Sequence, residues 1–493
     1  MLESGRLMHY ADLAVVVVYL LGITWFGARF RKSQRSLKDY FLGGRTAPWW
    51  AIALSIVSAE TSTLTIIGTP TLAFAGDFGF LQVVFGYLLA RLVISTLFLP
   101  HYFRGEMFTA YELIERRFGP RLRKLTAGTF LVVRAFAEGV RVFAISIVIS
   151  IILGTGEMAS IILIVCLTLF YTFEGGMTAV IWTDVVQMVL YVFGAIVSLV
   201  VILQQIPGGW EHVVEVAAPL GKFRVFDFGF SLTPEFFSRT YTFWAGIIGG
   251  TFLTTASHGT EQLMVQRLLA ARSKAESRAA LFASWAVIVF QFTLFLVIGT
   301  ILFVYYRDTG ATPPNPPDRL YPQFIWNQLP PGLAGLVIAA ILAAAMSNLS
   351  AALNSLASTT IMDFIKPIEK PGRRTEGSYL KMARGATVVW GIVLVAIGYA
   401  ARHWGSVLEA GLTVASIAYG GLLGVFLLGV LTRRVGEGAA MAGMVAGLAV
   451  VVFLKMETAV AWTWYVSAGT AVTFAAAWLA SFIFGERKWP KQA

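Results

Sequence analysis

The sequence has a single cysteine, Cys166, among its 493 residues, so no disulfide can form within the chain. Charged side chains are also scarce at 13%, whereas hydrophobic residues make up 57% and the mean hydropathy is +0.73. This composition excludes a string of soluble domains and is typical of a polytopic membrane protein. Since no polar stretch is long enough to fold alone, residues 1–493 are expected to form one transmembrane domain.

Apolar runs of roughly 20 residues, the length of helix that crosses about 30 Å of hydrocarbon, recur along the sequence. We therefore predict an all-α polytopic membrane protein with about thirteen transmembrane helices. The predicted spans are 9–28, 48–74, 78–100, 125–153, 157–175, 177–204, 240–263, 279–305, 331–362, 383–401, 404–431, 438–454 and 459–484. The first is too long for a cleaved signal and is followed by the basic run ARFRKSQRSLK, so it is expected to remain as an anchor.

Basic residues are concentrated in the connections on one side of these spans. About 27 of the 38 Lys and Arg lie within 29–45, 104–124, 267–278, 366–384, 433–434 and 487–491, against about eight on the other side. Because cytoplasmic loops are rich in Lys and Arg, we predict a multi-pass plasma-membrane protein with its N-terminus outside and its C-terminus cytoplasmic. The net charge of +11 reflects this asymmetry and indicates membrane lipid, not nucleic acid, as the surroundings.

Two of the predicted spans are interrupted by polar residues at matching places. The second span contains SAETST at 58–63, and the seventh, five spans later, contains TTASHGTE at 254–261. Interrupted helices in corresponding positions are typical of transporters built from inverted repeats, with the binding site near the middle of the membrane. We predict repeats at about 48–204 and 240–431.

A stripe of polar residues also runs through the ninth span, in AAAMSNLSAALNSLASTT at 343–360. Steps of three and four residues place five of them on one face of a helix, with Asn348 and Thr359 beside it: Ser347, Ser350, Asn354, Ser355 and Ser358. Each hydroxyl could simply bond back to its own helix, but the amide of Asn348 cannot be fully satisfied there. Hydroxyl, amide and freed backbone oxygens suit a hard monovalent cation. The sequence therefore predicts an ion between this stripe and the break near residues 54–57.

Six motifs in order resemble the sodium:solute symporter family, and the resemblance covers about residues 8–485. They are KDYFLGGR (38–45), SAETSTLTIIGTP (58–70), MFTAYELIERRFG (107–119), FEGGMTAVIWTDVVQ (173–187), EQLMVQRLLAARS (261–273) and SNLSAALNSLASTTIMDFIKP (347–367). The resemblance implies a LeuT-like five-plus-five inverted repeat with one extra helix before it and two after. It also implies a sodium-coupled symporter of a small solute, with the sodium ion as the co-transported species.

The same resemblance implies which residues bind sodium. The shared site corresponds to the carbonyls of Leu54, Val57 and Ala344 with the side chains of Ser347 and Asn348, where the family usually has Ser or Thr in place of Asn348. Some members have a second sodium site, for which Asp184 and Ser350 are the matching residues, although Ala351 stands where another hydroxyl is needed. We therefore expect one sodium ion. A local role for Asp184 at the start of a helix is the alternative.

The fourth span carries Arg134, Glu138 and Arg141 on one helical face, which must turn toward the bundle because unpaired charge in lipid is costly. Either the three residues only lock helices together, or one arginine is free for an anionic solute. The GTP segment at 68–70 resembles the branch of the family that moves monocarboxylates, vitamins or iodide. The further expected solute-binding residues are Ser58, Thr61, Ser257, His258 and Thr413.

Three functions other than sodium symport are less consistent with the sequence. Ser257 and His258 could serve an intramembrane enzyme, but adjacent helical residues point about 100° apart, so the pair is not expected to interact, and a packing role for His258 is the simpler alternative. A sodium-independent or proton-coupled transporter would make Asn348 a disabling change. A channel would need a continuous polar pore, which the broken-helix symmetry disfavours.

Overall fold

The structure, a computed structural model, describes residues 9–30, 36–153, 155–315, 317–369, 374–401 and 407–484. Within these residues the regular structure is helical, and the only β-type pairing is one isolated bridge between Ala47 and Ala271. The longest helices are α1 (Tyr10–Ala28), α8 (Pro120–Leu153), α9 (Glu157–Gln204), α14 (Lys274–Thr309), α16 (Leu333–Thr359), α17 (Glu376–Ala401), α18 (Val407–Leu431), α19 (Glu437–Glu457) and α20 (Tyr465–Phe484). The predicted all-α class is confirmed.

Both predicted interruptions are real breaks between helices. The first separates α3 (Trp49–Glu60) from α4 (Thr63–Ala75), and the two halves are bent by 65°. The second separates α12 (Gly250–Gly259) from α13 (Gln262–Leu269). Ser62 is the N-cap of α4. Its hydroxyl accepts the backbone N–H of Thr65, and the Thr65 hydroxyl accepts the backbone N–H of Ser62. The polar residues of the break thus stabilise it locally.

Helix α9 contains a third irregularity at a predicted boundary. Gly176 has φ 52° and ψ −150°, a conformation that glycine alone adopts readily, and it divides the 48-residue helix at the point between the fifth and sixth predicted spans. Two further predicted spans contain π-helical turns. These are η3 (Ile94–Phe98) after α5 (Leu81–Val93) and η4 (Ala245–Gly249) before α12. Each such turn shifts the register of the following side chains.

Helix α16 is the centre of the packing and is buried along nearly its whole length. It packs against α9, α1, α8, α17 and α3, which explains why it is apolar all round apart from its polar stripe. Its N-terminus is capped from another helix, since the carboxylate of Asp12 on α1 accepts the backbone N–H groups of Gly332 and Gly335, each at 2.7 Å. At its other end α16 continues through η6 (Thr360–Ile365).

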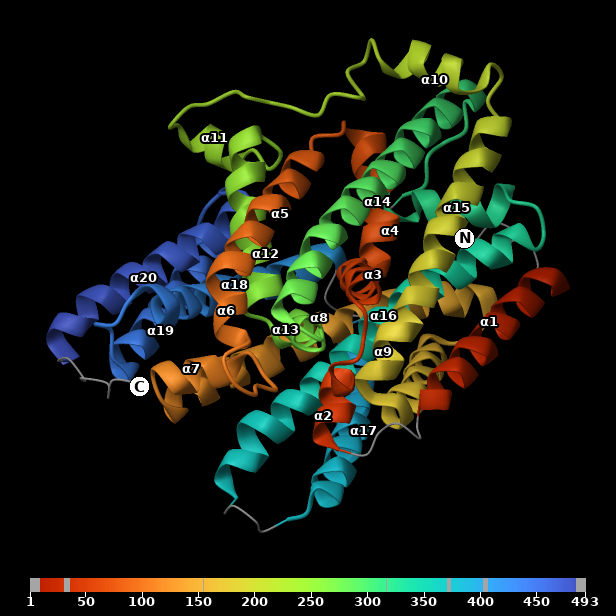
Figure 1. Ribbon diagram of the computed structural model, residues 1–493. Helices are drawn as coiled ribbons and strands as arrows, with labels where there is room; N and C mark the ends of the chain where they lie inside the picture. The colour runs from red at the N-terminus through yellow and green to blue at the C-terminus, as the bar shows by residue number, and fades with distance from the viewer. Residues whose placement is uncertain are drawn as a thin grey trace.

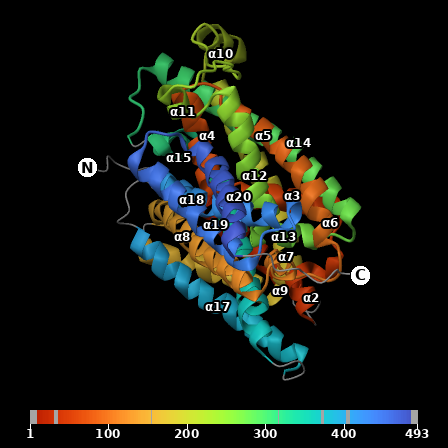
Figure 2. The same ribbon diagram turned by 90° about the vertical axis from the view of Figure 1, so that its left-hand side faces the viewer.

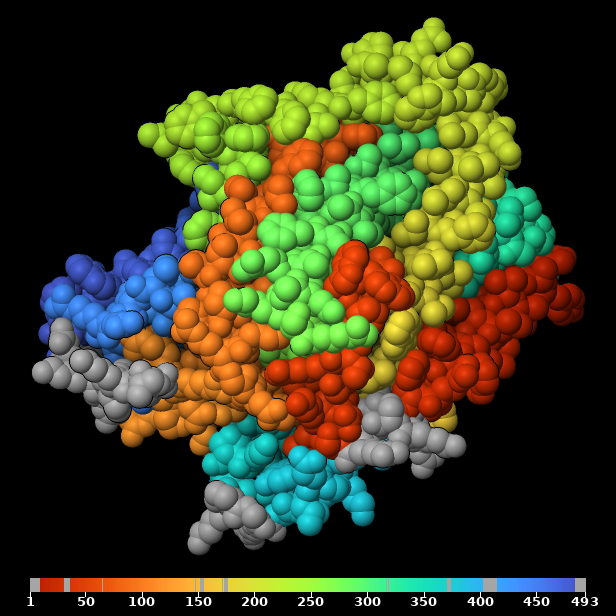
Figure 3. Space-filling view, viewed as in Figure 1, coloured from red at the N-terminus to blue at the C-terminus, as the bar shows by residue number. Residues whose placement is uncertain are grey.

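Short helices lie at the two ends of the molecule. Figures 1 and 2 place α10 (Gly209–Ala217) and α11 (Pro234–Ser238) at one end, and α2 (Leu37–Leu42), α7 (Tyr111–Arg117) and the foot of α17 at the other. Figure 3 shows that the segment containing α10 and α11 covers its end of the bundle. The remaining short helices are α6 (Leu99–Tyr102) and α15 (Leu320–Gln328).

Each of the thirteen predicted spans coincides with helical structure. Among the described residues, eight helices are long and apolar enough to cross a membrane, and the bent pair α3–α4 raises that number to nine. Shorter apolar helices cover Glu157–Phe170 and Ala415–Leu431. The count of thirteen and the repeat boundaries at 48–204 and 240–431 stay predictions.

Candidate functional site

The break between α3 and α4 faces the polar stripe of α16. Thr61 ends α3 in an extended conformation (φ −81°, ψ 110°), so its carbonyl oxygen leaves the helical bonding pattern. The side-chain amide of Asn348 donates to that oxygen at 2.6 Å and to the carbonyl of Ala344 at 3.3 Å. The predicted pairing of the break with this stripe is therefore present in the structure, and Asn348 makes the direct contact.

Ser347 is the meeting point of three helices. Its hydroxyl donates to Oδ1 of Asp184 on α9 at 2.6 Å and lies 2.8 Å from the hydroxyl of Ser58 on α3. Because a hydroxyl has one hydrogen and that of Ser347 goes to the carboxylate, Ser58 must be the donor in the second contact. All three side chains are fully buried. The oxygens of α3, α9 and α16 thus form one connected cluster.

The other predicted sodium ligands are arranged less simply. Leu54 and Val57 lie on α3 as expected, but the Val57 carbonyl accepts the backbone N–H of Thr61 at 2.9 Å and so still belongs to the helix. Ser350 donates to the carbonyl of Ser347 on its own helix at 3.0 Å and does not bond to Asp184. The contacts form two sets, one of Ser347 with Asp184 and the other of Asn348 with the carbonyls of Thr61 and Ala344.

The prediction that Arg267 lies in a connection between spans is wrong. This residue was assigned to a cytoplasmic connection, yet it lies on α13, is 1% exposed, and donates to Asp184 Oδ2 at 2.8 Å. Its Nε also donates to Ser55, whose hydroxyl donates to the same carboxylate oxygen at 2.5 Å. The guanidinium supplies the positive charge that a second sodium ion beside Asp184 would supply. The helical spacing of Gln262, Gln266 and Arg267 with apolar neighbours was the signal that could have revealed this burial.

The predicted cluster on α8 is present and larger than expected. Glu138 accepts from both Arg134 and Arg141 at 3.1 Å, and Arg134 also contacts Glu261, the residue before α13, at 3.3 Å. Tyr419 on α18 donates to Glu261 at 2.8 Å. Two arginines thus face two glutamates, so the cluster is neutral overall. Arg134 bonds to both acids, whereas the side chain of Arg141 is 26% exposed and, among the described residues, bonds to Glu138 alone.

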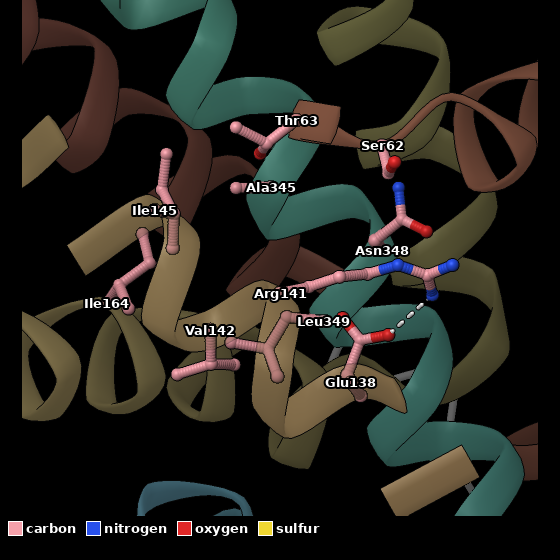
Figure 4. A pocket seen from close by; sticks show the side chains of 10 residues that line it. All are labelled: Ser62, Thr63, Glu138, Arg141, Val142, Ile145, Ile164, Ala345, Asn348 and Leu349. Atoms are coloured by element: carbon pink, nitrogen blue, oxygen red, sulfur yellow. Dashed lines mark hydrogen bonds and ion pairs between the residues drawn. The ribbon is translucent and has the colours of Figure 1, made fainter. Parts of the chain in front are cut away.

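Arg141 and Asn348 line the same small pocket. Figure 4 shows the guanidinium of Arg141 reaching beneath Asn348 while it bonds to Glu138, with Ser62 and Thr63 of the broken helix at the opposite wall. The pocket has a volume of about 10 Å³, which is room for roughly one water molecule. Any solute that binds between these residues requires the surrounding helices to separate. Ser62 and Thr63 were not among the predicted solute-binding residues.

The predicted solute-binding residues fall into three groups. Ser58 belongs to the oxygen cluster, and Thr61 exchanges hydrogen bonds with Gln291 on α14, so neither side chain faces the pocket. Thr413 lies outside the residues whose side chains the structure describes. Ser257 and His258 lie at the end of α12, and there the expectation that they cannot pair is wrong, since the Ser257 hydroxyl is 2.8 Å from His258 Nδ1. The 100° separation holds for the Cβ atoms, while side-chain rotation brings the polar ends together.

Glu60 joins the two broken helices and was not predicted to act. It is the last residue of α3, and its Oε2 lies 3.2 Å from His258 Nε2 on α12 and 3.2 Å from Nη2 of Arg91 on α5. The sequence placed Glu60 in the interrupted span and Arg91 in the next one, but only the fold brings His258 to them. In the described part of the chain, no group of three or more His, Cys, Asp or Glu residues is arranged to hold a metal ion.

Comparison with known proteins identifies relatives along most of the chain. A model of the sodium:solute symporter family matches residues 40–447. The human Sodium/iodide cotransporter is 28% identical over 459 residues (91% of this chain, 69% of that protein), and the Sodium/sialic acid symporter SiaT of Proteus mirabilis is 29% identical over 447 residues (89% and 88%). The human Sodium-coupled monocarboxylate transporter 1 is 28% identical over 452 residues (90% and 72%).

Solved structures agree with these sequence matches. A substrate-bound, outward-open structure of a Na⁺-coupled sialic acid symporter superposes with a TM-score of 0.86 at 26% identity, covering 97% of this chain and 99% of that one. A nucleobase-cation-symport-1 family transporter shares the fold, with a TM-score of 0.54 at 13% identity over 90% of this chain. The predicted LeuT-like architecture has its counterpart in these two structures.

Proposed function

We propose that this chain, which belongs to the sodium:solute symporter family, couples inward movement of sodium to import of a small organic solute that carries a carboxylate or another anionic group. Membership confirms the predicted family and the prediction that the chain is not an enzyme, because the family and the relatives named above are transporters. The identity of the solute, the sodium-binding residues and the orientation in the membrane belong to the proposal.

The observation that carries the proposal is the convergence of oxygen atoms at Ser347. Sodium is a hard cation that prefers several oxygen ligands, and the hydroxyls of Ser58 on α3 and Ser347 on α16 and the carboxylate of Asp184 on α9 are joined there by hydrogen bonds. Sodium held among Ser347, Asn348 and the carbonyls of Ala344, Leu54 and Val57 would tie the broken helix to α16. We take one ion per cycle, because Arg267 already neutralises Asp184.

Arg141 supports an anionic solute. Its guanidinium has five N–H donors, Glu138 takes one of them, and the side chain lines the pocket beside Asn348. A carboxylate on the solute would pair with the remaining donors in a planar, two-point contact. The relatives named for iodide, monocarboxylates and sialic acid all move solutes that are anions at neutral pH. Arg134 holds the helices together instead of binding solute.

Coupling follows from the position of Asn348 between the ion cluster and the pocket. Sodium that orders α3 against α16 also orders Ser62 and Thr63 at the pocket wall, which favours solute binding. Release of sodium to a cytoplasm of low sodium concentration loosens the same contact and lowers the affinity for solute. The ion and the solute act on one another through the difference in their affinities for the two states.

The test measures thermal unfolding of the purified protein in sodium chloride and in choline chloride at equal ionic strength. A ligand that binds only the folded protein stabilises it by about 2.7 kcal/mol at 100 times its Kd. We expect a sodium-specific rise in Tm for the wild type and for Ser355→Ala, a matched control on the same helix whose hydroxyl only bonds back to Ala352. Ser347→Ala should lose the rise.

The solute is then sought by uptake into proteoliposomes under a sodium gradient. Sialic acid, a short monocarboxylate and iodide are the first probes, each with its uncharged or cationic analogue where one exists. Arg141→Gln should raise the KM of an anionic solute about tenfold or more while the sodium-dependent rise in Tm remains. The proposal would be contradicted if the Tm is equal in sodium and in choline and the rate of solute uptake is the same with and without a sodium gradient.

A further inference from the structure

His258 sits in a hydrogen-bond network that can hold it in either of two protonation states. When the imidazole is neutral, its Nε2–H donates to Glu60 and its Nδ1 accepts the hydroxyl of Ser257. When it is charged, both ring nitrogens donate, and the Ser257 hydroxyl turns toward the carbonyl of Thr254, 3.4 Å away. Rotation of one hydroxyl therefore suffices to accommodate the extra proton.

The charge around this histidine is balanced without it. Arg91 is fully buried, pairs with Glu60 at 3.2 Å, and is anchored by bonds from Nε to the carbonyl of Leu281 and the hydroxyl of Ser284. Since that arginine already neutralises the carboxylate, a neutral His258 leaves the cluster uncharged and a protonated one makes it +1. The imidazole is 2% exposed, whereas its two hydrogen-bond partners Glu60 and Ser257 are partly exposed.

The other titratable groups that the surrounding helices direct toward this cluster are tyrosines and arginines. Tyr87 of α5 and Tyr191 of α9 lie within electrostatic range of Glu60, Tyr419 of α18 bonds to Glu261, and Tyr102 of α6 donates to the carbonyl of Gly259. Arg267 of α13 pairs with Asp184. Tyrosine hydroxyls stay protonated and arginines stay charged at physiological pH. His258 contributes the imidazole of this cluster, the side-chain type that ordinarily changes charge near neutral pH.

The cluster is connected to the proposed solute pocket through both broken helices. Glu60 precedes Ser62 and Thr63, which line the pocket. His258 lies three residues before Glu261, which contacts Arg134 and through it Glu138 and the pocket arginine. A positive charge gained at His258 lies near the end of α12 and beside Glu60 at the end of α3, which Ser62 and Thr63 of the pocket closely follow in sequence.

From this geometry we infer that His258, held between Glu60 and Ser257, is a proton-binding site, and that its protonation strengthens binding of the anionic solute. The inference rests on the proposed function and adds the proton as a third bound species. Because a bound anion stabilises the added positive charge, solute binding draws a proton from solution, and a proton raises the affinity for solute by the same factor.

The experiment measures sodium-driven solute uptake into proteoliposomes from pH 5.5 to 8.5, with the same pH on both sides and sodium saturating. A carboxylate solute remains ionised throughout this range. For the wild type we expect the KM for solute to fall about fivefold or more from the alkaline to the acid end, as is typical of coupled sites. H258Q can still donate to Glu60 but cannot titrate, so its KM should not change with pH. H101Q and H212Q, at histidines of α6 and α10 away from the breaks, should keep the wild-type profile.

Three results would overturn the inference. A wild-type KM that is the same at every pH would do so while the proposed sodium symport stands, and a pH dependence that survives in H258Q but disappears in E60Q would place the proton on the carboxylate. Absence of sodium-driven uptake at every pH would overturn the proposed function and this inference together. If H258Q fails to fold, the test is proton uptake by the wild type in weakly buffered solution. We expect addition of solute to cause uptake of up to one proton per chain. Absence of proton uptake would contradict the inference.

Discussion

The orientation of one amide, that of Asn348, determines how a cation can be held between α3 and α16. In the structure its nitrogen donates to the carbonyls of Thr61 and Ala344, so two backbone oxygens that could bind sodium are turned toward an N–H donor. A sodium ion at this place requires the amide to rotate until its oxygen faces the ion. The free energy required for that rotation weakens the binding of sodium.

We therefore predict that Asn348→Ser tightens sodium binding severalfold, because a serine hydroxyl can coordinate sodium without first breaking the two hydrogen bonds that the Asn348 amide donates. Asn348→Leu, similar in size but without an oxygen, should raise the sodium Kd at least tenfold, which corresponds to about 1.4 kcal/mol. Sodium titrations followed by the shift in Tm measure both. Weaker binding by the serine variant than by the wild type would contradict this view of the amide.

The pair of Arg267 and Asp184 gives a second prediction about single side chains. Both are buried, at 1% and 0% exposure of the side chain, and each is the other's charge partner. Arg267→Gln leaves a buried carboxylate without a counter-ion, which we expect to lower the free energy of unfolding by about 3–5 kcal/mol. The double variant with Asp184→Asn should recover a large part of that loss, because two neutral amides can bond to one another.

Chemical denaturation of the two single variants and the double variant measures this coupling as a double-mutant cycle. If sodium restores the free energy of unfolding of the single variant Arg267→Gln, then sodium replaces the guanidinium beside Asp184. Equal loss in the single and double variants would show that the pair contributes little beyond its packing.

Among whole helices, α1 and α16 depend on one another through the cap at Asp12. The N-terminus of α16 lacks a side-chain cap of its own, and the carboxylate of Asp12, 1% exposed, accepts two of its free backbone N–H groups. Gly335 permits this approach, because a Cβ there would lie 2.5 Å from the Asp12 Cα. The extra N-terminal helix therefore fixes one end of the helix that carries the proposed ion site.

We predict that Asp12→Ala lowers the free energy of unfolding by about 1–3 kcal/mol, since it leaves buried N–H donors without partners. The sodium Kd should be unchanged, because Ser347 lies about three turns farther along α16. Val18→Ala is the matched control, because Val18 lies on an exposed face of α1, the helix that carries Asp12, and this change should have little effect on the free energy of unfolding. A raised sodium Kd in Asp12→Ala would mean that the cap also positions the ion site.

The broken helices were the part of the architecture that the sequence predicted well. A polar run such as SAETST in an apolar span has few ways to satisfy its groups in lipid, so it marks a break directly. Partners across the fold could not be predicted this way, because Glu261 meets Arg134 and Glu60 meets His258 only after helices distant in sequence have packed. Arg267 was misplaced because the predicted seventh span ended at residue 263, which separated Arg267 from Gln262 although both lie on α13.

The whole protein is expected to cross the membrane with the α10–α11 end outside and the α2–α7 end in the cytoplasm, from the distribution of Lys and Arg. Figure 1 places these two ends opposite one another, so each can carry a reporter. After Cys166→Ala removes the single cysteine, Ser231→Cys introduces one in an exposed segment beside α11, and Lys274→Cys introduces one at the exposed start of α14.

In intact cells a membrane-impermeant maleimide should label Ser231→Cys and leave Lys274→Cys unlabelled, and permeabilisation should expose the second to the reagent. Both variants lie outside the ion and solute residues, so sodium-driven uptake by each confirms that the labelled protein is folded. The reverse labelling pattern would invert the assignment. Sodium and solute would then enter the cell from the α2–α7 end, and the inward sodium gradient would still drive import.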